Sequence, residues 1–300
     1  MIYTVTFNPA VDYVVKTGNL TPGAVNRSES EEIFFGGKGI NVSIVLKELG
    51  VKSKALGFVA GFTGAAIEEG INYQGIDTDF VHLKKGFSRI NVKIKSDAET
   101  ELNGQGPEIS DDAINELFKK LEILQENDML ILAGSIPGSL PPDIYEKIIE
   151  RLNGKGIRFV VDATKSLLLN VLKYHPFLIK PNNFELAEIF NVPINTTDDV
   201  IKYACKLKEM GAVNVLVSRA EDGAVLIDEN NDVHVIEAPT GKVLNSVGAG
   251  DSMLAGFIAG YTSASDYNYA LKLGTASGSA TAFSEGLAER NLIDELLKKI

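Results

Sequence analysis

After residue 110, apolar stretches typical of strands alternate regularly with stretches typical of helices, and few fold classes accommodate that pattern. Strands typical of a buried sheet are expected at Asp128–Ala133, Ile157–Asp162 and Phe177–Lys180, with helical segments between them. Strands joined by helices run parallel and cross over in the right-handed sense, so the pattern predicts a mostly parallel sheet. With 300 residues and 45% hydrophobic content, the chain can bury one large α/β core.

Two earlier sections, residues 11–35 and 87–105, do not follow this alternation. Both contain short strand-like runs, and Ile90–Lys95 alternates apolar and polar side chains. A strand with a polar face is suited to a sheet that stands partly in water. We therefore expect one domain spanning residues 1–300, in which the sections 11–35 and 87–105 form a small β-sheet lid.

A glycine-rich turn, Gly36-Gly37-Lys38-Gly39-Ile40-Asn41, is expected to open a helix. Glycines let the main chain approach a ligand closely, and a helix N-terminus attracts phosphate. Lys38 adds a full positive charge at this point. The alternative is a solvated lysine in a flexible turn. The entropic cost of the glycines favours the first interpretation, in which they serve ligand binding.

A second turn, Val247-Gly248-Ala249-Gly250-Asp251, runs into the apolar-periodic helix Met253–Tyr261. The unpaired amides and positive dipole of that helix start form a cradle for an anion, with a carboxylate beside it. Met253 stands where a dinucleotide fingerprint needs its third glycine, and no Lys-Ser/Thr pair makes a P-loop. The alternative is that Asp251 only stabilises the helix dipole.

Other candidates lie beside predicted strands. Asp12 follows the first strand, where ligands of open α/β sheets gather, but it is equally suited to an ordinary turn. Asn182 and Glu185 lie across a helix start and are suited to ordering hydrated Mg²⁺, or Glu185 is a simple first-turn acid. Arg89 begins a lid strand and is suited to a phosphate clamp or to a salt bridge at the rim.

The composition limits the kinds of partner that the chain is expected to bind and the cellular compartment in which it is expected. A formal net charge of −11 disfavours nucleic acid and anionic membrane surfaces. The single cysteine, Cys205, cannot form an internal disulfide, which fits a reducing compartment. The sequence shows no signal-peptide pattern and no apolar run long enough to span a bilayer. We therefore expect a cytoplasmic protein that binds neither nucleic acid nor membrane.

The two glycine motifs together resemble the two signatures of the ribokinase-like, or PfkB, carbohydrate kinases. Lys180-Pro181-Asn182-Asn183-Phe184-Glu185 is similar to the Asn-x-x-Glu motif of that family, and Gly134-Ser135-Ile136-Pro137 to its central strand-end loop. The resemblance spans the whole chain. It implies a ribokinase-like three-layer αβα core with a mostly parallel sheet, a small β-sheet lid, and ATP-dependent transfer of phosphate to a sugar.

The resemblance also implies a role for each matching residue. Asp251 would be the base that takes the proton from the acceptor hydroxyl, beside the amides of Gly248, Ala249 and Gly250. The substrate ligands it implies are Asp12, Gly36, Gly37, Lys38, Asn41, Arg89, Asn103 and Ser135. The ATP groove it implies is lined by Lys180, Asn182, Glu185, Ser218, Gly223, Gly248 and Gly250, with Mg²⁺ organised by Asn182 and Glu185 through water.

The resemblance also bears on the substrate. Ser88–Ile94 and Ser246–Met253 are most similar to the branch of the family that phosphorylates D-fructose 1-phosphate at O6. Tagatose 6-phosphate and fructose 6-phosphate are alternative acceptors, and a non-catalytic sugar-phosphate sensor is an alternative of another class. Asn245 stands where the family usually has aspartate, which leaves dependence on K⁺ open. A homodimer through the lid is consistent with apolar side chains on its strands.

Overall fold

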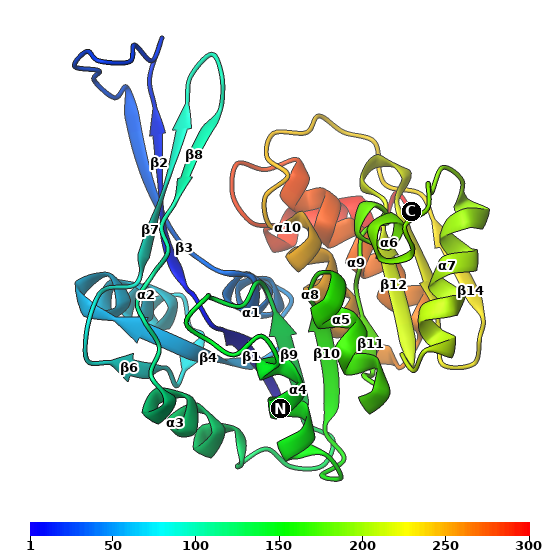
Figure 1. Cartoon of the computed structure of the whole chain (residues 1–300). Helices are drawn as coiled ribbons and strands as arrows, with labels where there is room; N and C mark the ends of the chain where they lie inside the picture. Colours follow the sequence, from blue (N-terminus) through cyan, green and yellow to red (C-terminus); the bar gives the residue numbers. More distant parts are fainter.

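The computed structural model describes residues 1–300 and contains a helix-covered central sheet and a smaller outer sheet (Figure 1). The central sheet has the order β14-β13-β12-β11-β10-β9-β1-β4-β5, with β6 also paired to β4. All its pairings are parallel except those of β13 with β12 and with β14, which are antiparallel. Its strands are β1 (Ile2–Thr6), β4 (Ser53–Ala60), β5 (Asp77–Thr78), β6 (Val81–Leu83), β9 (Met129–Ala133), β10 (Arg158–Asp162), β11 (Leu178–Ile179), β12 (Asn214–Ser218), β13 (Ala224–Ile227) and β14 (Val233–Ile236).

Helices cover both faces of the central sheet. One face carries α3 (Asp111–Leu121), α4 (Ile144–Leu152), α5 (Lys165–Val171), α6 (Asn183–Phe190) and α7 (Thr197–Glu209), with short 3₁₀ turns at Leu172–Tyr174 and Ala220–Asp222. The other face carries α1 (Lys38–Glu48), α2 (Gly61–Tyr73), α8 (Ala249–Ala264), α9 (Tyr267–Ala282) and α10 (Arg290–Leu297). The predicted three-layer αβα core is therefore confirmed.

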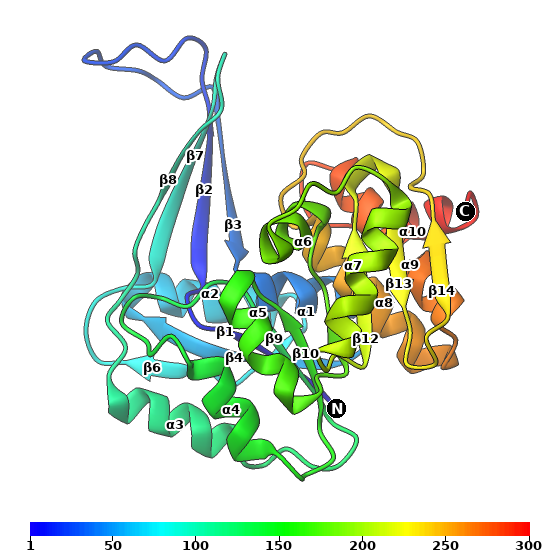
Figure 2. The ribbon, with the colours of Figure 1, turned by 45° about the vertical axis from the view of Figure 1, so that its right-hand side comes forward.

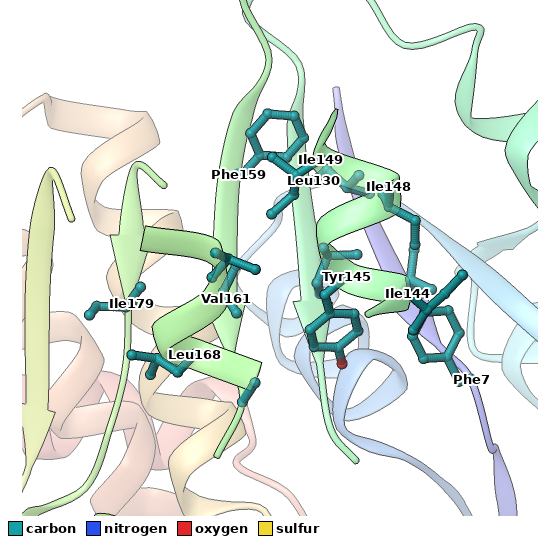
Figure 3. Close-up of a cluster of buried hydrophobic side chains, with 14 of the residues drawn as sticks. Phe7, Leu130, Ile144, Tyr145, Ile148, Ile149, Phe159, Val161, Leu168 and Ile179 are labelled. Carbon is teal, nitrogen blue, oxygen red and sulfur yellow. The ribbon is translucent and has the colours of Figure 1, made fainter. Parts of the chain in front are cut away.

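The core follows from strand periodicity. Leu130 and Val161 pack with α4 and α5 on one face, as Figure 3 shows, whereas their neighbours Ile131 and Val160 pack with α8 and α9 on the other. Because successive side chains of a strand point to opposite faces, a strand buried on both sides must be apolar at nearly every position. None of the helices has the length and apolarity needed to cross a bilayer.

The outer sheet projects away from the body in both views (Figures 1 and 2), and only its base lies against α2. Its strands are β2 (Ala10–Lys16), β3 (Ser30–Gly36), β7 (Arg89–Lys95) and β8 (Thr100–Asn103), in the order β3-β2-β7-β8. The strands β2 and β7 run parallel, and the two outer pairs run antiparallel, so the sheet is mixed. These strands lie at the ends of the two irregular sections, 11–35 and 87–105.

The two faces of the outer sheet differ in chemistry. Paired positions place Asp12 beside Asn91, and Asn91 beside Asn103, on one face. On the other face, Val11 packs with Phe35 and Ile90 against the side chains of α2. The register therefore separates a polar row, which begins next to the first glycine turn, from an apolar face.

Candidate active site

Most of the predicted site residues gather at the carboxyl edge of the central sheet. The turns after β1, β9, β10, β11 and β12 all lie there, because these strands are parallel. Distant motifs lie close together there: the stem of Lys38 lies beside Gly134, and the backbones of Asn182 and Ser218 form an isolated parallel bridge. Ligands of open parallel sheets bind at such an edge.

The second glycine turn presents free amides at the start of α8. Gly248 caps the helix with φ of 82°, a left-handed conformation that favours glycine, and a Cβ there would lie 2.6 Å from Leu287 Cδ2. The amide of Ala249 donates to the Ser246 carbonyl at 3.2 Å, whereas those of Gly248 and Gly250 have no partner in the protein. The helix start therefore offers N–H groups to an anion.

Asp251 lies in the first turn of this helix and is 5% exposed. Its Oδ2 accepts a hydrogen bond from Asn41 Nδ2 at 2.8 Å, which joins the two glycine motifs directly. Burial, together with the negative charge of Asp162, raises the pKa of Asp251 to about 6, against the opposing effects of Lys38 and Asn41. The group is therefore a stronger base than an ordinary aspartate and is ionised at neutral pH.

A second buried carboxylate, Asp162, has no role in the sequence-based interpretation. It ends β10 and is 1% exposed, with Oδ2 at 3.3 Å from Lys38 Nζ and Oδ1 at 3.5 Å from Lys180 Nζ. Burial alone would raise the pKa of Asp162, but the charges of Lys180 and Lys38 outweigh it and hold the pKa below its usual value. The sequence feature that could have identified Asp162 is its position as an acidic residue at the end of an apolar strand.

The first glycine turn has a structural explanation as well as a position at the site. A Cβ on Gly37, whose φ is 129°, would lie 2.5 Å from Thr6 Cγ2, and one on Gly39 would lie 2.6 Å from Thr6 Oγ1. Thr6 Oγ1 also accepts from the Ile40 amide at 3.1 Å. These two glycines thus allow α1 to pack closely on β1. Gly36 lies next to Asp12 and Asn41, at the entrance to the site.

The outer sheet brings Asp12 and Arg89 to the same region. Asp12 Oδ1 accepts from Asn91 Nδ2 at 2.7 Å, and its Oδ2 lies 3.7 Å from Lys93 Nζ. Arg89 donates its Nε to the carbonyl of Asn8 at 3.0 Å, which fixes the guanidinium at the base of the sheet. Asn91 is buried and was not predicted as a site residue, because its function depends on strand register.

Two of the residues predicted to bind the sugar phosphate are exposed and are held by few interactions within the protein. Asn103 ends β8, is exposed, and its Nδ2 lies 3.5 Å from Glu101 Oε2. Ser135 is exposed in the loop after β9 and makes no hydrogen bond within the protein. Neither side chain forms a hydrogen bond with Lys38 or Arg89, whose side chains bind Asp162 and the Asn8 carbonyl instead.

On the nucleotide side, Asn182 and Glu185 form a reciprocal capping box at the start of α6. Asn182 Oδ1 accepts from the Glu185 amide at 2.8 Å, and Glu185 Oε2 accepts from the Asn182 amide at 2.9 Å. No cluster of three or more His, Cys, Asp or Glu side chains is arranged to ligate a metal directly. The remaining Glu185 oxygen fits contact with Mg²⁺ through water.

Two further predicted nucleotide residues are Ser218, which ends β12, and Gly223, which lies in the turn after it. Ser218 pairs with Ala224 across the β12–β13 hairpin. Gly223 has φ of 83°, and a Cβ there would lie 2.0 Å from the Ile236 carbonyl, so the hairpin itself requires glycine. Asn245 donates to the Glu285 carbonyl at 2.9 Å and accepts from the Val247 amide at 3.0 Å, which ties down the approach to the second glycine turn.

A parallel α/β sheet with an anion cradle, a buried base and two ammonium groups at its carboxyl edge defines a small-molecule phosphotransferase. The pattern of the pfkB family carbohydrate kinases matches residues 5–293. The chain therefore belongs to the PfkB family of carbohydrate kinases.

Individual relatives agree with this family. A 1-phosphofructokinase of Bacillus subtilis (strain 168) is 48% identical over 300 residues, covering 100% of this chain and 98% of the relative. A D-tagatose-1-phosphate kinase of Bacillus licheniformis is 39% identical, covering 100% of this chain and 98% of the relative. The structure is similar to phosphofructokinase-2 from Escherichia coli in complex with substrates and products, with TM-score 0.94, 25% identity, and coverage of 99% of this chain and 98% of that one.

Proposed function

We propose that this kinase transfers the γ-phosphoryl group of ATP to O6 of D-fructose 1-phosphate, giving D-fructose 1,6-bisphosphate and ADP. The observation that carries the proposal is the buried Asp251 beside the free amides of Gly248 and Gly250, connected through Asn41 to the lysine-bearing glycine turn. The full-length similarity to a 1-phosphofructokinase at 48% identity supports the choice of acceptor.

Asp251 acts as the general base. Its carboxylate takes the proton from the O6 hydroxyl as that oxygen attacks phosphorus, and Asn41 holds the carboxylate in place through its 2.8 Å hydrogen bond. Because burial raises the pKa of Asp251 to about 6, the group is ionised at neutral pH yet accepts a proton more readily than a solvated aspartate. The proton of the O6 hydroxyl is thus transferred directly to Asp251.

The free amides of the second glycine turn stabilise the transferring phosphoryl group. Phosphoryl transfer depends mainly on alignment and on neutralising charge at the equatorial oxygens. The Gly248 and Gly250 amides and the dipole of α8 supply fixed partial positive charge there, while Ala249 keeps its hydrogen bond to Ser246. Lys180, whose Nζ lies 3.2 Å from the Cβ position of Gly250, adds a full charge beside the cradle.

The sugar phosphate is held between the first glycine turn and the outer sheet, which acts as a lid. Asp12 and Asn41 bind sugar hydroxyls, beside Gly36 and Gly37. The phosphate already on the sugar is bound by two cationic side chains, Lys38 and Arg89, together with the neutral side chains of Asn103 and Ser135. Closing the lid over the acceptor excludes water, which would otherwise compete for the phosphoryl group.

The remaining residues serve the nucleotide. Ser218, Gly223 and Lys180 line the ATP groove on the side of β12. Glu185, with one oxygen fixed by the Asn182 amide, orders a water shell with the other. A magnesium ion bound in this way supplies charge neutralisation for the phosphates of ATP.

The acceptor is tested by measuring ADP release with fructose 1-phosphate, tagatose 1-phosphate, fructose 6-phosphate, tagatose 6-phosphate and unphosphorylated fructose. The highest kcat/KM is expected for fructose 1-phosphate. A preference for unphosphorylated fructose would contradict the cationic pocket, and no ADP release with any sugar would favour a sensor. Running the assay in potassium and in sodium buffer settles whether Asn245 is compatible with activation by K⁺.

Tagatose 1-phosphate is the second candidate acceptor, because a D-tagatose-1-phosphate kinase is 39% identical over the full chain. The two sugars differ in configuration at C4, a hydroxyl that a hydrogen-bonding carboxylate such as Asp12 can distinguish. The ratio of kcat/KM for the two sugars in the wild type and in Asp12→Asn measures that discrimination. An unchanged ratio would exclude Asp12 as the determinant.

We also propose that the lid pairs with the lid of a second copy of the chain. The register aligns Ile33, Tyr13, Val92 and Leu102 in one row across the apolar face, with Ile33 60% and Leu102 63% exposed. An apolar row of this kind gains by burial in an interface. Ile33→Glu is expected to give monomers by analytical ultracentrifugation, whereas Lys16→Glu at the strand end is not. A wild-type monomer at micromolar concentration would overturn the proposal.

A further inference from the structure

Asp162 is a buried ionisable group at the active-site edge that the proposed mechanism does not use. Its two carboxylate oxygens face different lysines: Oδ2 lies 3.3 Å from Lys38 Nζ, and Oδ1 lies 3.5 Å from Lys180 Nζ. A carboxylate that is 1% exposed is costly to bury unless it is paired. Pairing with two cations from separate motifs offsets that cost and joins the motifs.

The two lysines stand on different sides of the proposed transfer path. Lys38 belongs to the first glycine turn, and its stem lies 3.8 Å from the Cβ position of Gly134. Lys180 is 4% exposed, and its ammonium lies 3.2 Å from the Cβ position of Gly250 in the phosphate cradle. The carboxylate of Asp162 thus contacts both Lys38, on the side of the proposed sugar site, and Lys180, beside the phosphate cradle.

Two ammonium groups brought close together in a buried site repel each other, and each has a long flexible stem. A carboxylate between them removes the repulsion and restricts both stems. Preorganised charge is effective in catalysis because it needs no rearrangement as charge develops in the transition state. Binding of the ground state depends less on exact placement, because a flexible lysine can still find a phosphate oxygen.

We propose that Asp162 is a positioning residue for phosphoryl transfer, which holds the ammonium groups of Lys38 and Lys180 on the two sides of the transfer path before the substrates bind. The inference rests on the proposed kinase function and deepens it. Asp162 does not touch the reacting atoms, and its effect passes through the two lysines.

Asp162 also contributes to the field at the base. The charged groups that face Asp251 are Lys38 from α1, Asp162 from β10 and Lys180 after β11, and the Asn41 amide binds its oxygen. After burial, the negative charge of Asp162 is the next cause of the raised pKa of Asp251. Removing that charge must lower the pKa of the base, an effect that a purely structural residue would not have.

The test is Asp162→Asn, which preserves shape but removes the charge. We expect kcat to fall about 10- to 10²-fold because the lysines lose their fixed placement. Each KM should change less than about threefold, because lost placement is offset by reduced repulsion of the phosphates. The acid limb of the kcat/KM profile should move to lower pH by about half a unit or more.

A matched control is Asp228→Asn, which neutralises another buried carboxylate at the opposite edge of the sheet. Asp228 accepts from the amides of Asn230 and Asp232, each at 2.9 Å, and from His234 Nε2 at 3.0 Å. This variant should lower the melting temperature while leaving kcat and the acid limb unchanged. Asp162→Glu should restore the acid limb but not kcat, because it returns the charge without the geometry.

A kcat within twofold of the wild type in Asp162→Asn, or an acid limb that does not move, would overturn the inference. If the Asp162 variants do not fold, acetylation of wild-type lysines by acetic anhydride decides the matter. Lys38, with its side chain 41% exposed, should react several-fold more slowly than Lys47, which is 48% exposed and paired only with Glu48 at the surface. Equal rates would show that Asp162 does not hold the amine.

This labelling measurement also separates the inference from the proposed function. A wild-type protein that releases no ADP with any sugar phosphate would contradict the kinase proposal, whatever the lysines do. Slow acetylation of Lys38 would then show that Asp162 does hold the Lys38 amine, but in a site whose function is not sugar phosphorylation. Activity in the wild type with unprotected Lys38 would leave the kinase proposal standing and remove the role of Asp162.

Discussion

The carboxyl edge of the central sheet and the outer sheet solve the same problem, holding charged groups in place, by different means. At the edge, Asp251 and Asp162 are almost fully buried, and their partners come from α1 and from the turn after β11. In the outer sheet, Asp12 is partly exposed, and its partners Asn91 and Lys93 lie on the adjacent strand.

The difference in burial indicates a division of labour. Interactions in a buried site are strengthened by low dielectric and are less sensitive to salt, whereas those of an exposed sheet are weaker and more adaptable. The central edge is therefore suited to the chemical step and the outer sheet to recognition of the substrate. Substitutions at the edge should lower kcat, and substitutions in the outer sheet should raise KM for the sugar phosphate.

The largest effect is expected for Asp251→Asn, which removes the proposed base. Turnover should fall by about 10²- to 10⁴-fold while binding of ATP, measured by calorimetry, is retained. The matched control is Asp266→Asn, because Asp266 caps α9 through the amides of Asn268 and Tyr269, and asparagine caps a helix equally well. Comparable turnover in the two variants would show that Asp251 only stabilises the helix dipole.

The next effect concerns the outer sheet. Arg89→Ala removes a charged donor from the proposed sugar-phosphate pocket, and the KM for fructose 1-phosphate should rise about 10- to 10²-fold, with the KM for ATP little changed. Lys16→Ala, an exposed cation at the end of β2, serves as the control for general charge. An equal rise in both KM values for Arg89→Ala would mean that the residue acts on the whole site.

A third effect is an increase in the free energy of unfolding when Asp251, at the carboxyl edge of the central sheet, is replaced by asparagine. The pKa of Asp251 is raised to about 6 in the folded protein, so ionising this group costs folding free energy at neutral pH. Asp251→Asn should therefore stabilise the fold by about 1–3 kcal/mol above pH 6, and the gain should fade towards pH 4, where the unfolded chain also becomes protonated. Thermal unfolding followed across this range would contradict the burial argument if the gain were independent of pH.

The smallest effect is expected for Asn91→Ala, which removes the amide that orients Asp12. Loss of one hydrogen bond to a partly exposed carboxylate should raise the KM for the sugar phosphate only a few-fold. Steady-state kinetics with saturating ATP measure the change. A large drop in kcat instead would show that the outer sheet takes part in the chemical step, and the contrast between the two regions would be lost.

The sequence predicted the parallel sheet and the two glycine turns because their signals are local. Periodic apolar residues reveal strands and helices, and glycines before Lys38 and Asp251 mark the two helix starts. The sequence could not reveal the partners of Asp162, because they depend on β10 lying between β9 and β11 in the sheet. Strand order is a property of the whole fold and has no local signal.

Two motifs show that the spacing of residues does not by itself reveal the reason for a motif. The glycines at 37 and 39 were interpreted as room for a ligand, but the structure uses them to bring α1 against Thr6. Asn182 and Glu185 were interpreted as a metal site, but they also form a capping box, whose spacing is the same. In both cases the spacing has a structural explanation, and the binding role remains a proposal.

The connections of the outer sheet to the body have a mechanical consequence. Only Gly37 separates the end of β3 from the start of α1. A hinge that short cannot absorb a swing of the sheet without rotating the first turn of the helix, where Lys38 is mounted. A tilt of the sheet towards the proposed sugar site therefore turns the backbone at Lys38, while the long side chain lets its ammonium remain beside Asp162, 3.3 Å away. The lid can then move without displacing the charge that we propose Asp162 holds.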